Sequence, residues 1–157
     1  MTSLRYIALD SDLTEIWRHG GPDANGQAPE RHVSDGGGNT CRHCLDDIAG
    51  GDPMLVLAHR PFPGPQPYAE IGPIFVHAED CPRYDEAAGV PGHYAQRQAV
   101  LIRGYGRDDR ILYGTGKVVP PTEIETTAAA LLSDPKVAYL HLRSSTNNCF
   151  QFRIERG

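Results

Sequence analysis

Glycine and proline constrain the fold of this chain more than any other feature of its sequence. They occupy 17 and 13 of the 157 positions, about a fifth of the chain. Because both residue types favour turns, the sequence predicts a fold rich in turns. The fraction is still below that of a low-complexity polymer, and the 39% of hydrophobic residues are enough for one core. We therefore predict a single globular domain that spans residues 1–157.

Short apolar segments between these turns predict strands and helices. Helices are predicted near Asp12 to Trp17, with Asp12 as the cap and Glu15 as its capping-box partner, and after Thr122 and Glu125, which form a second capping box. A further short helix fits the end of residues 87–98. The predicted strands are residues 4–9, 54–59, 74–77, 99–103, 110–119, 137–143 and 149–156. This pattern indicates an α+β domain with a largely antiparallel sheet of about six or seven strands and two or three helices.

The last two predicted strands alternate with a period of two, which assigns their side chains to faces. Leu140 and Leu142 share a face that is expected to pack on the core, as do Phe150, Phe152 and Ile154 in the partner strand. The opposite face carries polar side chains. By contrast, the polar, glycine-rich residues at about 21–40 show no such pattern, and we predict a mobile loop there.

Charge and hydropathy narrow the classes of partner. The net charge is −5, with 14 acidic and 6 basic residues in residues 1–96 against 6 and 9 in residues 97–157. A nucleic-acid-binding protein usually carries a basic excess over the whole domain, so we expect no nucleic-acid partner. No apolar run approaches the roughly 20 residues of a membrane span, and residues 1–10 lack the features of a signal peptide. We expect a cytoplasmic protein with no membrane partner; the sequence does not indicate its oligomeric state.

Two cysteine-containing pairs form the strongest candidate site. Cys41 and Cys44 lie in a C-x-x-C turn, and His77 and Cys81 have the spacing H-x3-C. Sulfur and imidazole ligands in fours are typical of a closed tetrahedral zinc site, so we predict zinc held by Cys41, Cys44, His77 and Cys81. His43 is an alternative to Cys44 as a ligand.

Other interpretations of the same residues stay open. Some of these thiols can be ordinary buried side chains. The C-x-x-C pair can also cycle between dithiol and disulfide, although the neighbouring Asp46 and Asp47 oppose a low thiol pKa. Cys81 beside His77 has the residue types of a cysteine nucleophile and its base.

A second candidate site lies on the polar face of the last two strands. His141, Arg143 and Arg153 fall on this face, and Asn147 and Asn148 follow in the connecting loop. Planar guanidinium groups bind carboxylates and phosphates with two parallel hydrogen bonds. We therefore predict a site for a small anion or a protein partner. The alternative is a solvated face in which Arg153 pairs with an acid such as Glu155 or Asp134.

Several segments carry a resemblance to a known family. These are Cys41-Arg42-His43-Cys44-Leu45, Pro67 to Glu70 leading into Gly72 to His77, Arg103-Gly104-Tyr105, and Ala138 to Phe150. Over roughly Cys41 to Arg156 the chain is similar to a bacterial family of small proteins described only as a domain of unknown function. The resemblance implies a single-domain, cytoplasmic bacterial protein and supplies no activity.

These observations favour a non-catalytic domain with a structural zinc site and a polar Arg/His sheet face for a small anion or a protein partner. The alternative is a small enzyme that uses a Cys/His nucleophile, a redox dithiol or a metal with an open coordination position. A plain interaction module with neither metal nor chemistry is the third interpretation.

Overall fold

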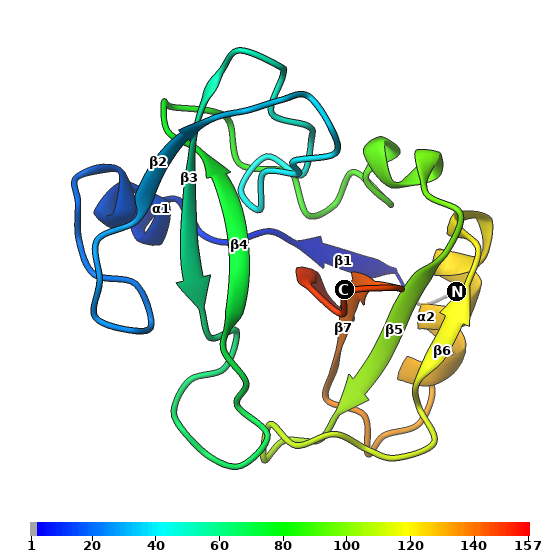
Figure 1. Cartoon of the computed structure of the whole chain (residues 1–157). Coiled ribbons are helices and arrows are strands. Elements are labelled where there is room, and N and C mark those ends of the chain that lie inside the picture. The colour runs from blue at the N-terminus through cyan, green and yellow to red at the C-terminus, as the bar shows by residue number, and fades with distance from the viewer. Residues whose placement is uncertain (1–2) are drawn as a thin grey trace.

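The computed structural model describes residues 3–157, which form an α+β domain with two antiparallel sheets (Figure 1). The strand order is β1-β8-β7-β5-β6 in the five-stranded sheet and β2-β3-β4 in the three-stranded sheet. The strands are β1 (Leu4–Ile7), β2 (Glu30–Val33), β3 (Pro53–His59), β4 (Gly72–His77), β5 (Val100–Tyr105), β6 (Lys117–Val119), β7 (Tyr139–Ser144) and β8 (Phe150–Arg156). The helices are α1 (Ser11–Arg18) and α2 (Ile124–Leu132), with 3-10 turns η1 (Gly92–Gln96) and η2 (Pro121–Glu123). The predicted α+β class and antiparallel pairing are confirmed, whereas the strands divide into two sheets instead of one.

Helix α1 begins two residues before the predicted position. The side chain of Asp10, not Asp12, accepts a hydrogen bond from the Leu13 N–H at 2.8 Å, so Asp10 is the cap. Both aspartates have the side-chain chemistry of a helix cap, so the residue type alone does not choose between them. The helix ends at Arg18, and Gly20, with a φ of +82°, follows its C-cap residue His19.

The capping box predicted for α2 is wrong. The helix follows η2 directly, and its cap residue Glu123 makes no side-chain capping hydrogen bond. Pro121 fixes the backbone of this 3-10 turn, which places Thr122 inside the turn and not at the helix start.

The segment at about 21–40 is not a loop throughout. Residues Glu30–Val33 form β2, which pairs in antiparallel register with β3 (Glu30 opposite Val56, Val33 opposite Pro53). All four residues of β2 are exposed, which explains why their sequence lacks the alternation of a half-buried strand. The mobility of the surrounding segment stays a prediction.

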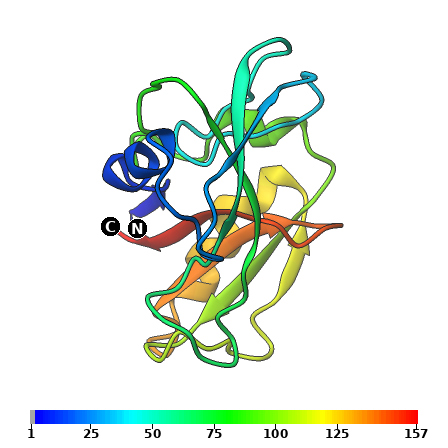
Figure 2. The same ribbon diagram turned by 60° about the vertical axis from the view of Figure 1, so that its left-hand side comes forward.

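Helix α2 covers one face of the five-stranded sheet and completes the larger core. Figures 1 and 2 show α2 on one side of this sheet and the three-stranded sheet on the other. Ile124, Ala128 and Leu132 of α2 pack with Leu140, Leu142, Phe152 and Ile154, all fully or almost fully buried. The predicted core face of the β7–β8 pair is thus confirmed for these residues.

Phe150 lies on the face opposite to the one predicted for it. A register shift at Leu142/Arg143 aligns Phe150 with Arg143, whereas Phe152 stays opposite Leu142. Such a β-bulge inserts one residue and reverses the alternation beyond it. The Phe150 ring consequently contacts His141, with ring centroids 4.8 Å apart.

The second core lies between α1 and the three-stranded sheet. It contains Trp17, Ile48, Met54, Leu57 and Val76, together with the fully buried Cys41. Cys44 and Cys81 pack at its edge. All three cysteines of the two predicted metal-ligating pairs therefore lie in or beside the smaller of the two main cores.

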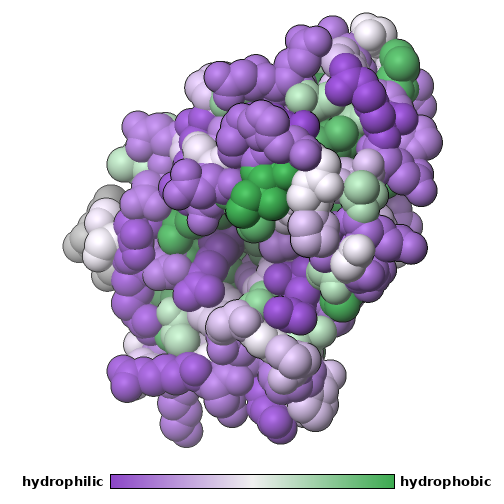
Figure 3. All heavy atoms as spheres, turned by 90° about the vertical axis from the view of Figure 1, so that its left-hand side faces the viewer, coloured by the Kyte–Doolittle hydropathy of each residue, from purple (hydrophilic) through white to green (hydrophobic). Residues whose placement is uncertain are grey.

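The surface of the molecule is mainly polar. Figure 3 shows one face on which hydrophilic side chains predominate and hydrophobic ones gather in small patches. Exposed large hydrophobic side chains in the described residues include Ile16 of α1, Val33 of β2 and Tyr113 in the connection between β5 and β6. Among residues 3–157, no helix has the length and apolar character needed to cross a bilayer.

Candidate metal centre

A tight turn presents Cys41 and Cys44 on one side. The Leu45 N–H donates to the Cys41 carbonyl at 2.9 Å, and the Cys41 N–H donates to the Asp46 carbonyl at 2.9 Å. Leu45 has a φ of +57°, a left-handed conformation that side chains other than glycine rarely adopt. The buried Leu45 side chain, which packs in the larger core, holds this conformation in place. The turn is thus fixed from both ends before any ligand is considered.

Backbone hydrogen bonds place this turn beside the end of β4. Cys41 forms a parallel bridge with Phe75, and the Arg42 N–H donates to the Phe75 carbonyl at 3.0 Å. His77 is the last residue of β4, two residues beyond Phe75. The chain then returns past Cys81, and the Tyr84 N–H donates to the His43 carbonyl at 2.9 Å. The two ligand pairs, distant in the sequence, therefore meet at one strand end.

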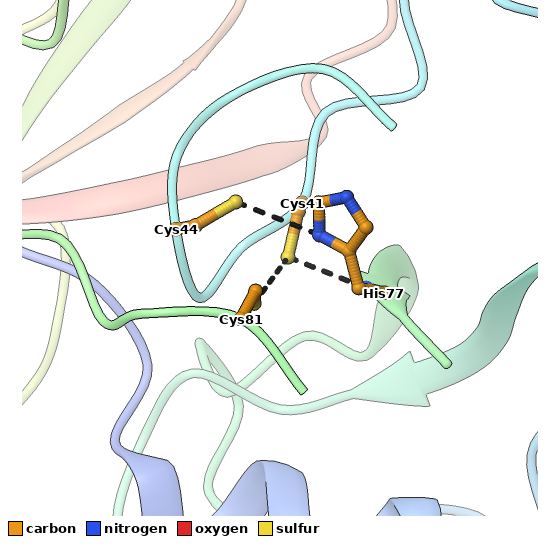
Figure 4. Close-up of side chains that lie close together, drawn as sticks. All are labelled: Cys41, Cys44, His77 and Cys81. Carbon is orange, nitrogen blue, oxygen red and sulfur yellow. Dashed lines mark hydrogen bonds between the residues drawn. The ribbon is translucent and has the colours of Figure 1, made fainter. Parts of the chain in front are cut away.

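The four side chains converge as the spacing of the two pairs predicts. Their ligand atoms, three Sγ atoms and an imidazole nitrogen, all lie within 4.8 Å of one another, and we call Cys41, Cys44, His77 and Cys81 the Cys3His cluster. The Cys41 and Cys81 sulfurs are 3.9 Å apart, and the Cys44 sulfur is 3.5 Å from Nδ1 of His77 (Figure 4). The cluster has the donor set and the spacing to hold a metal ion.

Nitrogen donors surround the sulfurs of the cluster. The His77 backbone N–H donates to the Cys41 sulfur at 3.3 Å, and Nη2 of Arg18 donates to the Cys81 sulfur at 3.3 Å. Nδ1 of His43 lies 3.1 Å from the same Cys81 sulfur, and Nε2 of His43 lies 2.8 Å from the Ser11 hydroxyl. Donors of this kind stabilise thiolate over thiol, which is the form that binds a metal.

The pKa values of the cluster indicate an ion pair between a thiolate and a protonated imidazole. Hydrogen bonds from the Cys44 and Cys81 thiols hold the pKa of Cys41 far below its ordinary value. The hydrogen bond to this thiolate, reinforced by its charge, raises the pKa of His77 to about 10. Cys44 in turn has a raised pKa, because its thiol donates to Cys41 and is partly buried. In the metal-free cluster the protonated His77 therefore balances the Cys41 thiolate, and a bound metal ion would displace this proton and those of the other thiols.

Burial divides the cluster into an inner and an outer part. Cys41 is fully buried, whereas Cys44, His77 and Cys81 are partly exposed. These three border an open depression of about 500 Å³ that Asp46 also lines. An ion bound by these four side chains would contact the core through Cys41 and would be open to solvent on the side of Cys44, His77 and Cys81.

The remaining candidates for this site fall outside the cluster. His43 approaches only the Cys81 sulfur and does not join the four converging ligand atoms, so the geometry selects Cys44 over His43. Cys149, in the loop just before β8, is free, and its thiol donates to the Asn147 carbonyl at 3.8 Å.

The polar face of β7 and β8 is largely buried. His141 and Arg143 are 1% and 2% exposed, and the Phe62 and Tyr105 rings pack against His141. Nη2 of Arg143 lies 2.9 Å from a carboxylate oxygen of Glu70, and Arg103 contacts the same oxygen at 2.5 Å. Burial and the neighbouring arginine charges lower the pKa of His141 well below its ordinary value, so this imidazole is neutral.

The five residues predicted for the anion site do not share one cavity. Arg143, Asn147 and Asn148 border a cavity of about 250 Å³, and the Asn148 carbonyl accepts a hydrogen bond from Arg143 at 3.1 Å. His141 lies beneath this surface. Arg153 lies over the Tyr139 ring, 3.6 Å from its centroid, and pairs with Glu155 at 2.5 Å.

Sequence reasoning misses three groups that shape these sites. Arg18 and the Ser11–His43 contact support the cysteine sulfurs, and Glu70 neutralises the arginines of the sheet face. Each acts across a long sequence separation, and no spacing or motif signals it. Glu70 does fall within one of the segments on which the family resemblance depends.

Comparison with known proteins gives one match. Residues 38–156 fit the family model described as "Protein of unknown function (DUF1203)", which agrees with the predicted resemblance. The match contains all four residues of the Cys3His cluster. Searches of curated proteins and of solved structures find no match.

Proposed function

We propose that this chain, which belongs to the DUF1203 family, is a non-catalytic binding domain stabilised by a structural zinc ion in the Cys3His cluster. Cys41, Cys44 and Cys81 would bind the ion through sulfur and His77 through Nδ1. A bacterial origin and a cytoplasmic location form part of the proposal. The four free cysteines support this location, since thiols persist in a reducing compartment.

The spacing of the ligand atoms carries the proposal. A tetrahedral zinc ion with bonds of about 2.3 Å to sulfur and about 2.05 Å to nitrogen has S–S and S–N edges of about 3.8 and about 3.6 Å. The corresponding distances in the cluster are 3.9 Å between the Cys41 and Cys81 sulfurs and 3.5 Å between the Cys44 sulfur and the His77 nitrogen. The other ligand atoms lie within 4.8 Å of one another, so the cluster would contract by up to about 1 Å to enclose zinc.

The surroundings suit the charge of such a site. Three thiolates and a neutral imidazole give a zinc complex with a net charge of −1. The Arg18 side chain, 7% exposed, donates to the Cys81 sulfur and places a positive charge beside the site, although its Nη1 also lies 3.4 Å from an Asp80 carboxylate oxygen. The N–H of His77 and Nδ1 of His43 add further donors to the sulfurs. Such outer contacts orient the ligands and tune metal affinity.

A structural role follows from what the ion would connect. The three-stranded sheet has an edge strand, β2, whose four residues are all exposed, and a small core that it shares with α1. Small cores of this kind gain stability from a metal cross-link. Zinc would join the Cys41–Cys44 turn to the end of β4 and to the segment that carries Cys81. Four protein ligands also fill the tetrahedron, which leaves no coordination position for a substrate.

A catalytic role for Cys81 is the second candidate function. Its sulfur lies 3.1 Å from Nδ1 of His43, and Nε2 of the same ring lies 2.8 Å from the Ser11 hydroxyl. A thiol, an imidazole and an orienting hydroxyl form the arrangement that a cysteine nucleophile uses. Fast alkylation of Cys81 by iodoacetamide in the protein as purified would favour this role, because zinc ligation slows that reaction.

The polar sheet face is part of the proposal as a contact for an acidic group. The Glu70 carboxylate already pairs with Arg103 and Arg143, so a carboxylate of a partner protein or small molecule would take its place. A thermal-shift screen of small anions tests this contact. A ligand held there should lose its effect in the Arg103→Gln variant, and an unchanged shift would remove this face from the account.

Cobalt substitution tests the zinc proposal directly. Co²⁺ added to metal-free protein should give the intense visible absorption of tetrahedral thiolate coordination, and one equivalent of Zn²⁺ should abolish it. The Cys44→Ser variant should weaken and shift the spectrum, whereas Cys149→Ser, which alters a cysteine outside the cluster, should leave it unchanged. Weak absorption typical of octahedral cobalt, or an identical spectrum in both variants, would refute the proposal.

A further inference from the structure

A second polar cavity lies on the other side of the Cys41–Cys44 turn. Its volume is about 600 Å³, within the usual range for small-molecule sites. Arg42, Arg97 and Asp47 contribute the charged groups of its lining, together with His93. The loop between β7 and β8 forms another part of the wall through residues 144–147. We call this space the Arg42–Arg97 cavity.

Arg42 is a buried cation without an anionic partner. Its side chain donates from Nε to the Phe150 carbonyl and from Nη1 to the Thr40 carbonyl, both at 2.6 Å, and the residue is 3% exposed. No carboxylate among residues 3–157 lies within ion-pair distance of it. The other buried arginine, Arg143, pairs with Glu70. A buried charge without a partner is unfavourable, so Arg42 would gain from an anion in the adjoining cavity.

Arg97 places a second positive charge beside the first. Its Nη2 donates to the Thr40 hydroxyl at 3.3 Å and to the Gln151 amide oxygen at 3.2 Å, while its guanidinium lies 4.9 Å from the centroid of the Tyr94 ring. Because Arg42 bonds the carbonyl of the same Thr40, one residue holds both guanidinium groups together. Burial lowers the pKa of Arg42 most, Tyr94 and Cys149 oppose this shift, and the nearby positive charge of Arg97 lowers the pKa further.

The other groups that face this pair do not neutralise it. Asp47 lines the cavity, but one of its carboxylate oxygens lies 3.7 Å from Nδ1 of His93 and the other, Oδ1, is buried without a hydrogen-bond partner in the described chain. The nearby Cys41 belongs to the Cys3His cluster, where an ion would take up the charge of its thiolate, and Cys149, which also lines the cavity, is a free cysteine.

The loop between β7 and β8 adds donors at the mouth of the cavity. Ser145, Thr146 and Asn147 are exposed and line it, so their hydroxyl and amide groups can turn toward a ligand. Two guanidinium groups with hydroxyl and amide donors around them make the usual environment of a bound oxyanion.

We propose that the Arg42–Arg97 cavity binds the phosphate or carboxylate group of a small polar molecule. Arg97 would contact the oxyanion directly, Arg42 would contribute its charge from the cavity wall, and the side chains of residues 145–147 would close over the rest of the ligand. This site is separate from the Cys3His cluster and from the Arg103–Arg143–Glu70 contact. It does not require either of those proposals to hold.

The experiment uses inorganic phosphate and acetate as the probes and compares Arg97→Gln with Arg107→Gln. Arg107 is exposed and forms no ion pair in the described residues, so this variant removes the same charge elsewhere. Titration calorimetry at fixed ionic strength should show binding of phosphate, acetate or both by the wild-type protein, and the stronger probe identifies the anionic group of the ligand. Arg97→Gln should weaken that binding by about tenfold or more, as loss of a charge-assisted hydrogen bond predicts, while Arg107→Gln should bind like wild type.

Two further variants keep the test decisive. Arg42→Lys retains the charge without the fixed hydrogen bonds, and a folded Arg42→Lys protein should bind the probe more weakly than wild type. Glu70→Gln exposes the arginines of the sheet face, so phosphate binding that rises in this variant and does not depend on Arg97 would assign the anion to that face and overturn the inference. Equal affinity in wild type and Arg97→Gln, or no binding of either probe, would also overturn it. The zinc content of every sample is measured as well. A protein that holds zinc but binds no anion would contradict this inference alone, and a protein without zinc would contradict the metal proposal alone.

Discussion

Replacement of Glu70 by Gln tests how the two sheets are held against each other. The Glu70 carboxylate lies on the connection between β3 and β4 and contacts two arginines of the five-stranded sheet, Arg143 at 2.9 Å and Arg103 at 2.5 Å. An amide of the same shape removes the negative charge and leaves Arg143 as an unpaired buried cation. We expect the free energy of unfolding to fall.

The exposed fractions of the three side chains determine how far the free energy of unfolding should fall. Arg143 and Arg103 are 3% and 15% exposed, which approaches the buried limit, where removal of one partner costs about 3–5 kcal/mol. Glu70 is 42% exposed, so water screens its carboxylate, and fully exposed pairs contribute only about 0–1 kcal/mol. Because the Glu70 contact lies between these two limits, we expect the free energy of unfolding to fall by about 2 kcal/mol. For a chain of this length that lowers Tm by about 4–8 °C.

Thermal unfolding followed by circular dichroism measures this loss. Glu79→Gln is the matched control, because Glu79 is exposed and makes no ion pair in the described residues. The difference between the two variants should shrink as salt is raised, since the pair is partly open to solvent. A Glu70→Gln protein whose Tm stays within about 1 °C of the control would refute the ion-pair account.

Three other predictions follow from the metal centre and the cores. A chelator should lower the Tm of the wild-type protein and of the Cys149→Ser variant by similar amounts. It should leave the Tm of the Cys81→Ser variant unchanged, because only this substitution disrupts the cluster. An equal change of Tm in all three proteins would contradict the ligand assignment. At free zinc about 100-fold above its Kd, ligation stabilises by about 2.7 kcal/mol, so chelation should speed hydrogen exchange of amides in residues 39–48 by about 100-fold and spare β7; a uniform change would show that the ion does not act locally. Burial lowers the pKa of His59 to about 4 from an ordinary 6.5, so the unfolded chain takes up this proton first and stability should fall as pH decreases from about 6.5 to about 4. In His59→Gln, urea unfolding should show a shallower fall, by up to roughly 1.4 kcal/mol per pH unit, and an unchanged slope would disprove the contribution.

Local sequence signals predict much of this fold because they act within one element. The alternation of Leu140, Leu142, Phe152 and Ile154 identifies a core face without knowledge of the partner strands, and the structure buries all four. The same logic fails at Phe150, where a bulge that no residue type announces reverses the alternation. It also fails at β2, whose exposed residues have no apolar face to show.

The metal centre is predictable from sequence for a different reason. The C-x-x-C and H-x3-C spacings indicate which side chains can bind one metal ion, although they do not indicate which contacts bring the two pairs together. That information lies in the parallel bridge between Cys41 and Phe75, a contact between segments 34 residues apart that only the folded chain supplies. Glu70 shows the limit most clearly. Its partner Arg143 is distant in the sequence, and an acidic residue among prolines gives no sign of the cation that it neutralises.

The metal content of the native protein tests the central claim most directly. Protein purified without an affinity tag and without added zinc should contain one zinc ion per chain by elemental analysis. Its three cluster cysteines should then resist a thiol reagent until a chelator is added, while Cys149 reacts. A chain with no bound metal and with all four thiols freely reactive in the folded state would contradict the account.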